Sequence, residues 1–194
     1  MDKYDPDIHH RRSIRLPGFD YTQDGAYSIT ICTHEKQCLF GDVIDGKMLL
    51  NRFGTLIYDC WIDLASRFQY IELDEFITMP NHVHGIILIR RGKAEPCPLP
   101  TPHPSKARLR LAPTPAFGKP VGKSVSSIIG SFKSTATRMM NAMRNTPGAP
   151  LWQRNYYEHI IRDDDDMNRT REYIIENPLR WYEDENNPSN PPNM

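Results

Sequence analysis

Two apolar runs that follow each other closely constrain the fold of this chain most strongly. Residues 70–79 (YIELDEFITM) and 82–90 (HVHGIILIR) are rich in β-branched and aromatic residues, which predicts two strands. They meet at Met79-Pro80-Asn81, which forms the connection or just enters the second strand. So short a connection favours neighbouring antiparallel strands.

Further strands and helices alternate along the rest of the chain. Asn51 can cap a helix with an apolar stripe at spacings of three and four, and Asp45-Gly46 between two apolar runs is typical of a hairpin with a type I′ turn. The predicted elements are a strand 25–34, this hairpin, a helix 51–68, the two strands above, a helix 124–143, a strand 151–163 and a helix 164–176. The order predicts an α+β fold, with helices on one face of a largely antiparallel sheet.

The 194 residues suffice for one compact domain, which we expect to span 25–182. Residues 1–24 are polar and irregular, and predict a flexible basic arm that includes Arg11, Arg12 and Arg15. Eight of the 17 prolines lie between Pro96 and Pro120, so we expect an inserted flexible loop at about 92–123. Residues 183–194 read as a disordered polar tail.

The net charge of zero hides a strong polarity along the chain. Between Arg90 and Arg144 there are eleven Lys or Arg and one acid, while the rest of the chain has 13 basic and 23 acidic residues. A basic middle segment is compatible with a polyanionic partner such as nucleic acid, which the overall neutrality seemed to exclude.

The sequence favours a cytoplasmic location with no membrane contact. No apolar run approaches the roughly 18 residues of a membrane span, and the N-terminus has no apolar signal segment. The four cysteines have no paired spacing, which is typical of reduced thiols rather than of a disulfide framework or a zinc knuckle.

His82 and His84 alternate in an apolar strand, so both imidazoles leave the same face of the sheet. Two neutral imidazoles on one face can bind a divalent metal ion. Taken alone, such a pair is more often ordinary sheet surface.

Tyr173 and Asn177 are four residues apart on the last predicted helix and therefore project from one side of it. The tyrosine could be a nucleophile and the amide oxygen a metal ligand. The alternative is that Tyr173 packs in the core and Asn177 caps the helix. Pro178 disfavours helical angles at Asn177, which would loosen the spacing.

Several ordered motifs together resemble one enzyme family. The string MPNHVHGIILI, followed by IIGSFKS, LWQRNYYEHIIRD and REYIIENPLRW, is similar to the single-tyrosine HUH transposases, and most closely to the REP-associated tyrosine transposases of the IS200/IS605-like group. The opening RRSIRLPGFDY and GAYSITICTHEKQCLFG also fit that branch, so the likeness covers most of residues 11–182.

The resemblance implies a ferredoxin-like fold with the HUH motif on a central strand. It implies metal ligation by His82 and His84, with Val83 as the hydrophobic residue between them, and Tyr173 as the nucleophile. Asn177 falls where the insertion-sequence enzymes usually carry a glutamine ligand, which is a departure that the REP-associated branch shares. The ion expected from the family is Mg²⁺ or Mn²⁺, although imidazoles would also accept Zn²⁺.

The implied reaction cuts single-stranded DNA that folds into REP-like hairpins. A tyrosine attacks the phosphodiester, forms a 5′-phosphotyrosine link, and leaves a free 3′-hydroxyl for rejoining. Lys133, Arg138 and Arg154 are the candidates for DNA-backbone contacts, with a plain solvated helix face as the alternative. Related enzymes act as dimers or monomers, and the sequence does not decide between them.

Two other readings of the sequence stay open at this point. Tyr156 or Tyr157 could replace Tyr173 as the nucleophile, because adjacent strand residues face opposite ways. The protein could also be a degenerate relative that binds hairpin DNA without cutting it, or a small metal-dependent hydrolase that uses water. His159, beside Glu158, reads as an ordinary strand residue, and the acids at 163–166 as a helix start.

Overall fold

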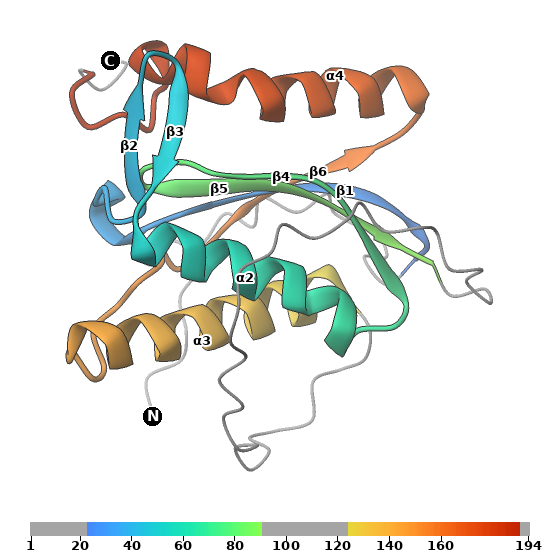
Figure 1. The fold of residues 1–194 in the computed structure, drawn as a ribbon. Coiled ribbons are helices and arrows are strands. Elements are labelled where there is room, and N and C mark those ends of the chain that lie inside the picture. Colours follow the sequence, from blue (N-terminus) through green and yellow to red (C-terminus); the bar gives the residue numbers. More distant parts are fainter. Residues whose placement is uncertain (1–22, 91–123, 191–194) are drawn as a thin grey trace, which may run out of the picture.

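A computed structural model describes residues 23–90 and 124–190 of the chain. Its core is a β-α-β-β-α-β arrangement with an added hairpin and a further helix (Figure 1). In chain order the elements are β1 (Gly25–Cys32), η1 (His34–Lys36), β2 (Gly41–Ile44), β3 (Lys47–Leu50), α2 (Arg52–Arg67), β4 (Ile71–Thr78), β5 (His82–Ile89), α3 (Val125–Arg144), β6 (Tyr157–Ile161), α4 (Asp164–Glu176) and η2 (Asn177–Glu183).

The main sheet is antiparallel, with strand order β4-β5-β1-β6. This is the ferredoxin-like order, and it places β5 with its two histidines at an internal position. Cys32 pairs with His82 and Thr30 pairs with His84, so β1 lies directly beside the motif. The predicted α+β class and the central position of the motif are confirmed.

The helices cover both faces of the sheet, which corrects the expectation that they share one. Helices α2 and α3 lie together on one face, over a core that includes Ile29, Val83 and Ile87. Helix α4 crosses the opposite face and packs Ile174 against Ile86 and Ile161 (Figure 1). The sequence does not predict this arrangement, because Ile174 is the buried residue of α4. So weak an apolar pattern does not indicate which face of the sheet the helix covers.

Local sequence signals account for the element boundaries. The Asn51 side chain accepts hydrogen bonds from the backbone amides of Phe53 and Gly54, as predicted for an N-cap. Ser124 and Ser127 form a reciprocal capping box at the start of α3. Asp45 and Gly46 both have positive φ, which confirms the type I′ turn between β2 and β3.

Strand β6 is shorter than the predicted strand 151–163, because a lysine side chain binds the backbone carbonyls of the residues that precede it. Lys133 Nζ donates to the carbonyl oxygens of Gln153, Arg154 and Asn155 at 2.6, 3.2 and 3.4 Å. A strand would present those carbonyls to a neighbouring strand. Only residues from Tyr157 onward therefore pair with β1, apart from an isolated bridge between Thr33 and Trp152.

The first part of the polar segment predicted as a tail, up to residue 190, makes hydrogen bonds with η2. Asn187 is buried and donates to the Trp181 carbonyl, and Asn190 donates to the carbonyls of Tyr182 and Asp184. These hydrogen bonds fold residues 184–190 back on η2. Two predicted segments lie outside the described residues. They are the loop at 92–123 and the part of the arm (1–24) up to residue 22.

Gly85, in the strand that carries the two histidines, leaves room for a pair of large aromatic side chains. A β-carbon at Gly85 would lie 2.4 Å from Trp61 Cζ2 and 2.8 Å from Phe76 Cδ2. These two rings stack at 4.6 Å, and Trp61 is fully buried. The indole therefore touches the backbone of β5 directly, on the face opposite His82 and His84.

We expect Gly85→Ala to lower the free energy of unfolding by about 1–3 kcal/mol, as overpacking does in other cores. Gly130→Ala is the matched control, because nothing lies within 4 Å of a β-carbon built there, on the exposed side of α3. It should stabilise the protein by about 0.5–1 kcal/mol through helix propensity. Urea unfolding of both variants measures this, and equal effects would contradict the packing argument.

Candidate metal and tyrosine site

The two histidines of β5 face helix α4 and lie in direct contact with each other. His82 is fully buried and His84 is 3% exposed, and their Nε2 atoms are 2.9 Å apart. Burial lowers the pKa of His82 to about 4 and that of His84 to about 3. Both rings are therefore neutral at pH 7, which is the form that binds a metal ion.

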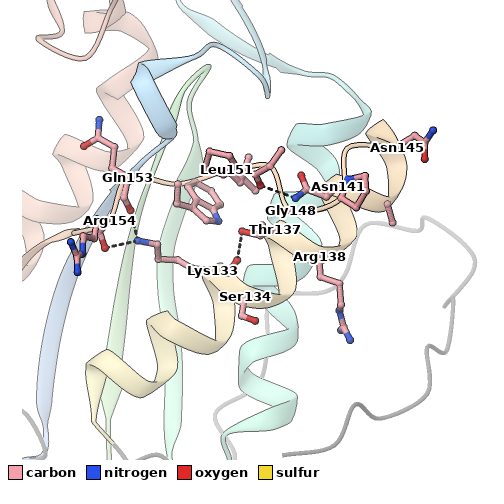
Figure 2. Close-up of a pocket in the computed structure, with 15 residues that line it drawn as sticks. Lys133, Ser134, Thr137, Arg138, Asn141, Asn145, Gly148, Leu151, Gln153 and Arg154 are labelled. Carbon is pink, nitrogen blue, oxygen red and sulfur yellow. Dashed lines mark hydrogen bonds between the residues drawn. The ribbon is translucent and has the colours of Figure 1, made fainter. Parts of the chain in front are cut away.

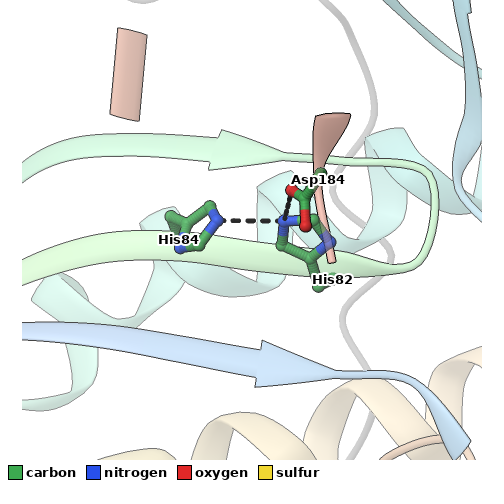
Figure 3. A group of neighbouring side chains, drawn as sticks. All are labelled: His82, His84 and Asp184. Carbon is green, nitrogen blue, oxygen red and sulfur yellow. Dashed lines mark hydrogen bonds and ion pairs between the residues drawn. The ribbon is translucent and has the colours of Figure 1, made fainter. Parts of the chain in front are cut away.

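Asp184 supplies a carboxylate to the same place (Figure 3). Its Oδ2 lies 3.6 Å from His82 Nε2, and its side chain is 8% exposed. One ligand atom from each of His82, His84 and Asp184 lies within 4.8 Å of the others, so the three form a group that could hold a divalent metal ion. The sequence alone does not indicate Asp184, because it lies in the polar segment that predicts a disordered tail.

Asn177 lies at the junction of α4 and η2 and is also part of the site. It is 3% exposed, and its Oδ1 has no hydrogen-bond partner in the described part of the chain. Burial lowers the pKa of His82 and raises that of Tyr173, and the Asn177 side chain acts against both shifts, so the amide lies close to both groups. A buried carbonyl oxygen without a donor fits a cation, since leaving it unpaired costs free energy.

Pro178 does not loosen the position of Asn177, contrary to expectation. Asn177 keeps helical angles (φ −53°, ψ −39°), because α4 continues directly into the 3₁₀ helix η2. Proline suits the start of such a helix, where its missing N–H is not needed. The four-residue spacing from Tyr173 is thus preserved.

Tyr173 of α4 lies beside the histidine pair. Its ring centroid is 5.2 Å from that of His84, in an edge-on arrangement, and the residue is 46% exposed. Partial burial raises the pKa of its phenol, and the carboxylates of Asp184 and Glu185 raise it further. Without a bound cation, Tyr173 is therefore protonated at neutral pH.

Polar contacts fix the helix that carries Tyr173. Arg171 forms a two-pronged ion pair with Asp74 of β4, with both N···O distances at 2.7 Å. In the first turn of α4, Asp166 Oδ2 lies 2.9 Å from His159 Nε2 on β6. His159 thus has a structural partner, which agrees with its reading as a strand residue without a nucleophile.

Known proteins provide a comparison for this geometry. No protein-family model matches the chain. An uncharacterized protein of Haemophilus influenzae is 42% identical to it over 183 residues, which are 94% of this chain and 96% of that protein. The chain belongs to the family of that protein. Its family membership thus extends over nearly the whole length.

A solved structure shows the same fold. The REP-associated tyrosine transposase bound to a REP hairpin superposes with a TM-score of 0.53 at 17% identity, over 93% of this chain and 74% of that chain. This likeness concerns the fold of the chain. No helix among the described residues is long and apolar enough to cross a membrane.

The two competing tyrosines lie at the start of β6, on opposite sides of the sheet. Tyr156 packs against the core under α2 and α3. Tyr157 is 53% exposed and pairs with Thr30, whose other neighbour in the sheet is His84, so it faces the same side as the histidines. It is separated from His84 by a whole strand, whereas Tyr173 contacts the His84 ring.

The three cations predicted to contact DNA line one groove, between the C-terminal half of α3 and residues 147–154 (Figure 2). The groove has a volume of about 820 Å³. Lys133, Arg138 and Arg154 contribute to its lining, and none of the described residues around it is acidic. Lys133 differs from the other two, since its ammonium is half-buried against the 153–155 carbonyls and burial lowers its pKa.

One end of the groove reaches the C-terminal end of β1, whereas His82 and His84 face α4 on the other side of the sheet. Gln153, at this end, donates its backbone N–H to the Cys32 carbonyl at 2.9 Å, and Cys32 is the strand partner of His82. Figure 2 shows Arg154 near this end and Asn145 at the other.

Proposed function

We propose that this protein is a metal-dependent DNA-strand transferase that nicks and rejoins hairpin-forming single-stranded DNA through a covalent tyrosine intermediate. The observation that carries the proposal is the contact between Tyr173 and His84, beside a group able to hold a divalent ion. The shared fold with a REP-associated tyrosine transposase supports it.

In this reaction Tyr173 Oη attacks the phosphorus of a phosphodiester. The bond from phosphorus to the 3′-oxygen breaks, the phenol loses its proton, and the departing 3′-oxygen takes one up. A 5′-phosphotyrosine link and a free 3′-hydroxyl result, and the reverse attack rejoins a strand. Such a covalent step divides a difficult displacement into two easier ones.

The site residues have distinct roles in this chemistry. His82, His84 and Asp184 would hold a divalent ion, with Asn177 Oδ1 as a further donor. The ion, expected to be Mg²⁺ or Mn²⁺, would supply positive charge to the non-bridging phosphate oxygens and favour the phenolate. Arg171 and Asp74 would keep Tyr173 over the histidines by fixing α4.

The groove beside α3 would bind the DNA backbone. Arg138 and Arg154 are exposed and line it, whereas Lys133 would add charge from beneath while holding the 153–155 turn. Such contacts give affinity rather than sequence choice, which the hairpin shape would provide. A single chain brings together the tyrosine and all the metal-site residues, so cleavage would not require a dimer.

Tyr173→Phe should abolish the covalent protein–DNA adduct that forms with single-stranded hairpin DNA and Mn²⁺. Tyr157→Phe is the matched control, because that tyrosine is exposed on the same face but one strand farther from His84. It should form adducts at the wild-type level. Denaturing gel electrophoresis reads both, and adducts that persist without the Tyr173 hydroxyl would refute the assignment. Hairpin binding without any adduct would instead indicate a non-cutting relative.

The metal ligands can be ranked by calorimetric titration with Mn²⁺. We expect His84→Ala and Asp184→Asn to weaken Mn²⁺ binding by more than about tenfold, since loss of even a supporting group commonly costs that much. Asn177→Ala should weaken it similarly if Oδ1 is a ligand. The exposed neighbour Glu183 provides the control, as Glu183→Gln should leave the affinity unchanged. Unchanged affinity for Asp184→Asn would remove that carboxylate from the ligand set.

Arg138→Gln and Arg154→Gln should each weaken hairpin binding and reduce its dependence on salt. A plot of log affinity against log salt concentration has a negative slope, and each lost phosphate contact makes that slope shallower by about 0.7 for a single strand. Arg169→Gln, on the exposed side of α4, is the control. Fluorescence anisotropy over a salt series measures the slopes, and three identical slopes would exclude the groove as a backbone contact.

A further inference from the structure

Asn81, the residue before β5, makes more side-chain hydrogen bonds than its place in a connection suggests. It is fully buried. Its Nδ2 lies 2.9 Å from the Lys36 carbonyl oxygen and 2.6 Å from that of Asn186, and its Oδ1 lies 2.9 Å from His82 Nδ1. One amide thus joins the η1 loop, the C-terminal segment and the metal site.

The two carbonyl contacts fix which way the amide points. A carbonyl oxygen can only accept, so the atom that faces Lys36 and Asn186 must be the NH₂ group. The atom that faces His82 is then the carbonyl oxygen, which also only accepts. His82 Nδ1 must therefore carry the hydrogen.

This hydrogen determines the chemistry of the opposite ring nitrogen. A neutral imidazole with hydrogen on Nδ1 has its lone pair on Nε2, and His82 Nε2 is the atom that faces His84 and Asp184. The network thus presents a metal-binding lone pair to the site before any ion arrives.

His84 has the opposite arrangement. Because His82 Nε2 can only accept, the 2.9 Å contact between the rings requires a hydrogen on His84 Nε2. His84 Nδ1 then accepts from the Thr30 hydroxyl, 2.8 Å away. A hydroxyl can donate or accept, so its oxygen can equally accept a hydrogen bond from Nδ1–H once His84 Nε2 binds a cation.

We propose that Asn81 and Thr30 are positioning residues that set the tautomers of the metal-binding histidines. Asn81 locks His82 with Nε2 free. Thr30 permits His84 to change tautomer when a cation binds. The ring then loses the hydrogen on Nε2, gains one on Nδ1, and stays neutral. The part that concerns the cation rests on the proposed function, whereas the tautomers of the metal-free protein do not.

Long-range ¹H–¹⁵N NMR of the ring nitrogens in the wild-type protein tests both assignments. Without metal, His82 should show the Nδ1–H pattern and His84 the Nε2–H pattern. Diamagnetic Zn²⁺ should convert His84 to Nδ1–H and leave His82 unchanged. An Nε2–H pattern at His82, or a His84 pattern that stays the same with Zn²⁺ bound, would overturn the proposal. If Zn²⁺ does not bind at all, the metal part of the proposed function fails, while the metal-free patterns still decide the role of Asn81.

Two substitutions separate the tautomer lock from a general structural role. Asn81→Ala removes the acceptor, so His82 should lose its single tautomer and Mn²⁺ should bind about 10–100-fold more weakly. Asn81→Asp keeps the acceptor but not the donors to Lys36 and Asn186, so it should retain the His82 pattern and bind Mn²⁺ within a few-fold of wild type.

Asn51→Ala is the control, since Asn51 also bridges backbone groups of two segments but lies away from the site. It should change neither the His82 pattern nor the Mn²⁺ affinity. The same Mn²⁺ loss in Asn81→Asp as in Asn81→Ala, or no loss in either, would contradict the lock.

Discussion

Strand β5 is buried on both faces, and its alternation of side chains organises the molecule. Val83, Gly85 and Ile87 point into the core under α2 and α3, where the Trp61 ring lies against the glycine backbone. His82, His84 and Ile86 point the other way, under α4. A shift of one residue in register would exchange the histidines with the core residues. The close fit of Trp61 at Gly85 therefore also fixes the position of the metal site.

Local chemistry made much of this predictable from the sequence. The Asn51 cap, the Asp45-Gly46 turn and the two histidines on one face each depend on residues close together in the chain. Strand β6 was overestimated because Lys133, about twenty residues earlier, captures the carbonyls of residues 153–155. A contact of that kind leaves no periodic signal.

Asp184 was missed for a similar reason. Glu183, Asp184 and Glu185 look alike as a short acidic run, and only the fold of residues 184–190 back on η2 turns Asp184 toward His82. Its exposed neighbours face solvent. Asn81 likewise reads as a turn residue until Lys36 and Asn186 are placed beside it. The residues that support the site thus come from segments that are distant in the sequence.

Peptide mapping would show whether Tyr173 itself carries the broken DNA strand. A hairpin DNA would be incubated with the protein and Mn²⁺, the complex denatured, and protein and DNA digested before mass spectrometry. Our account predicts a nucleotide phosphate on the tryptic peptide 172–180, at Tyr173. A modified peptide that contains Tyr156 or Tyr157 instead, or cleaved DNA with no modified peptide, would contradict it.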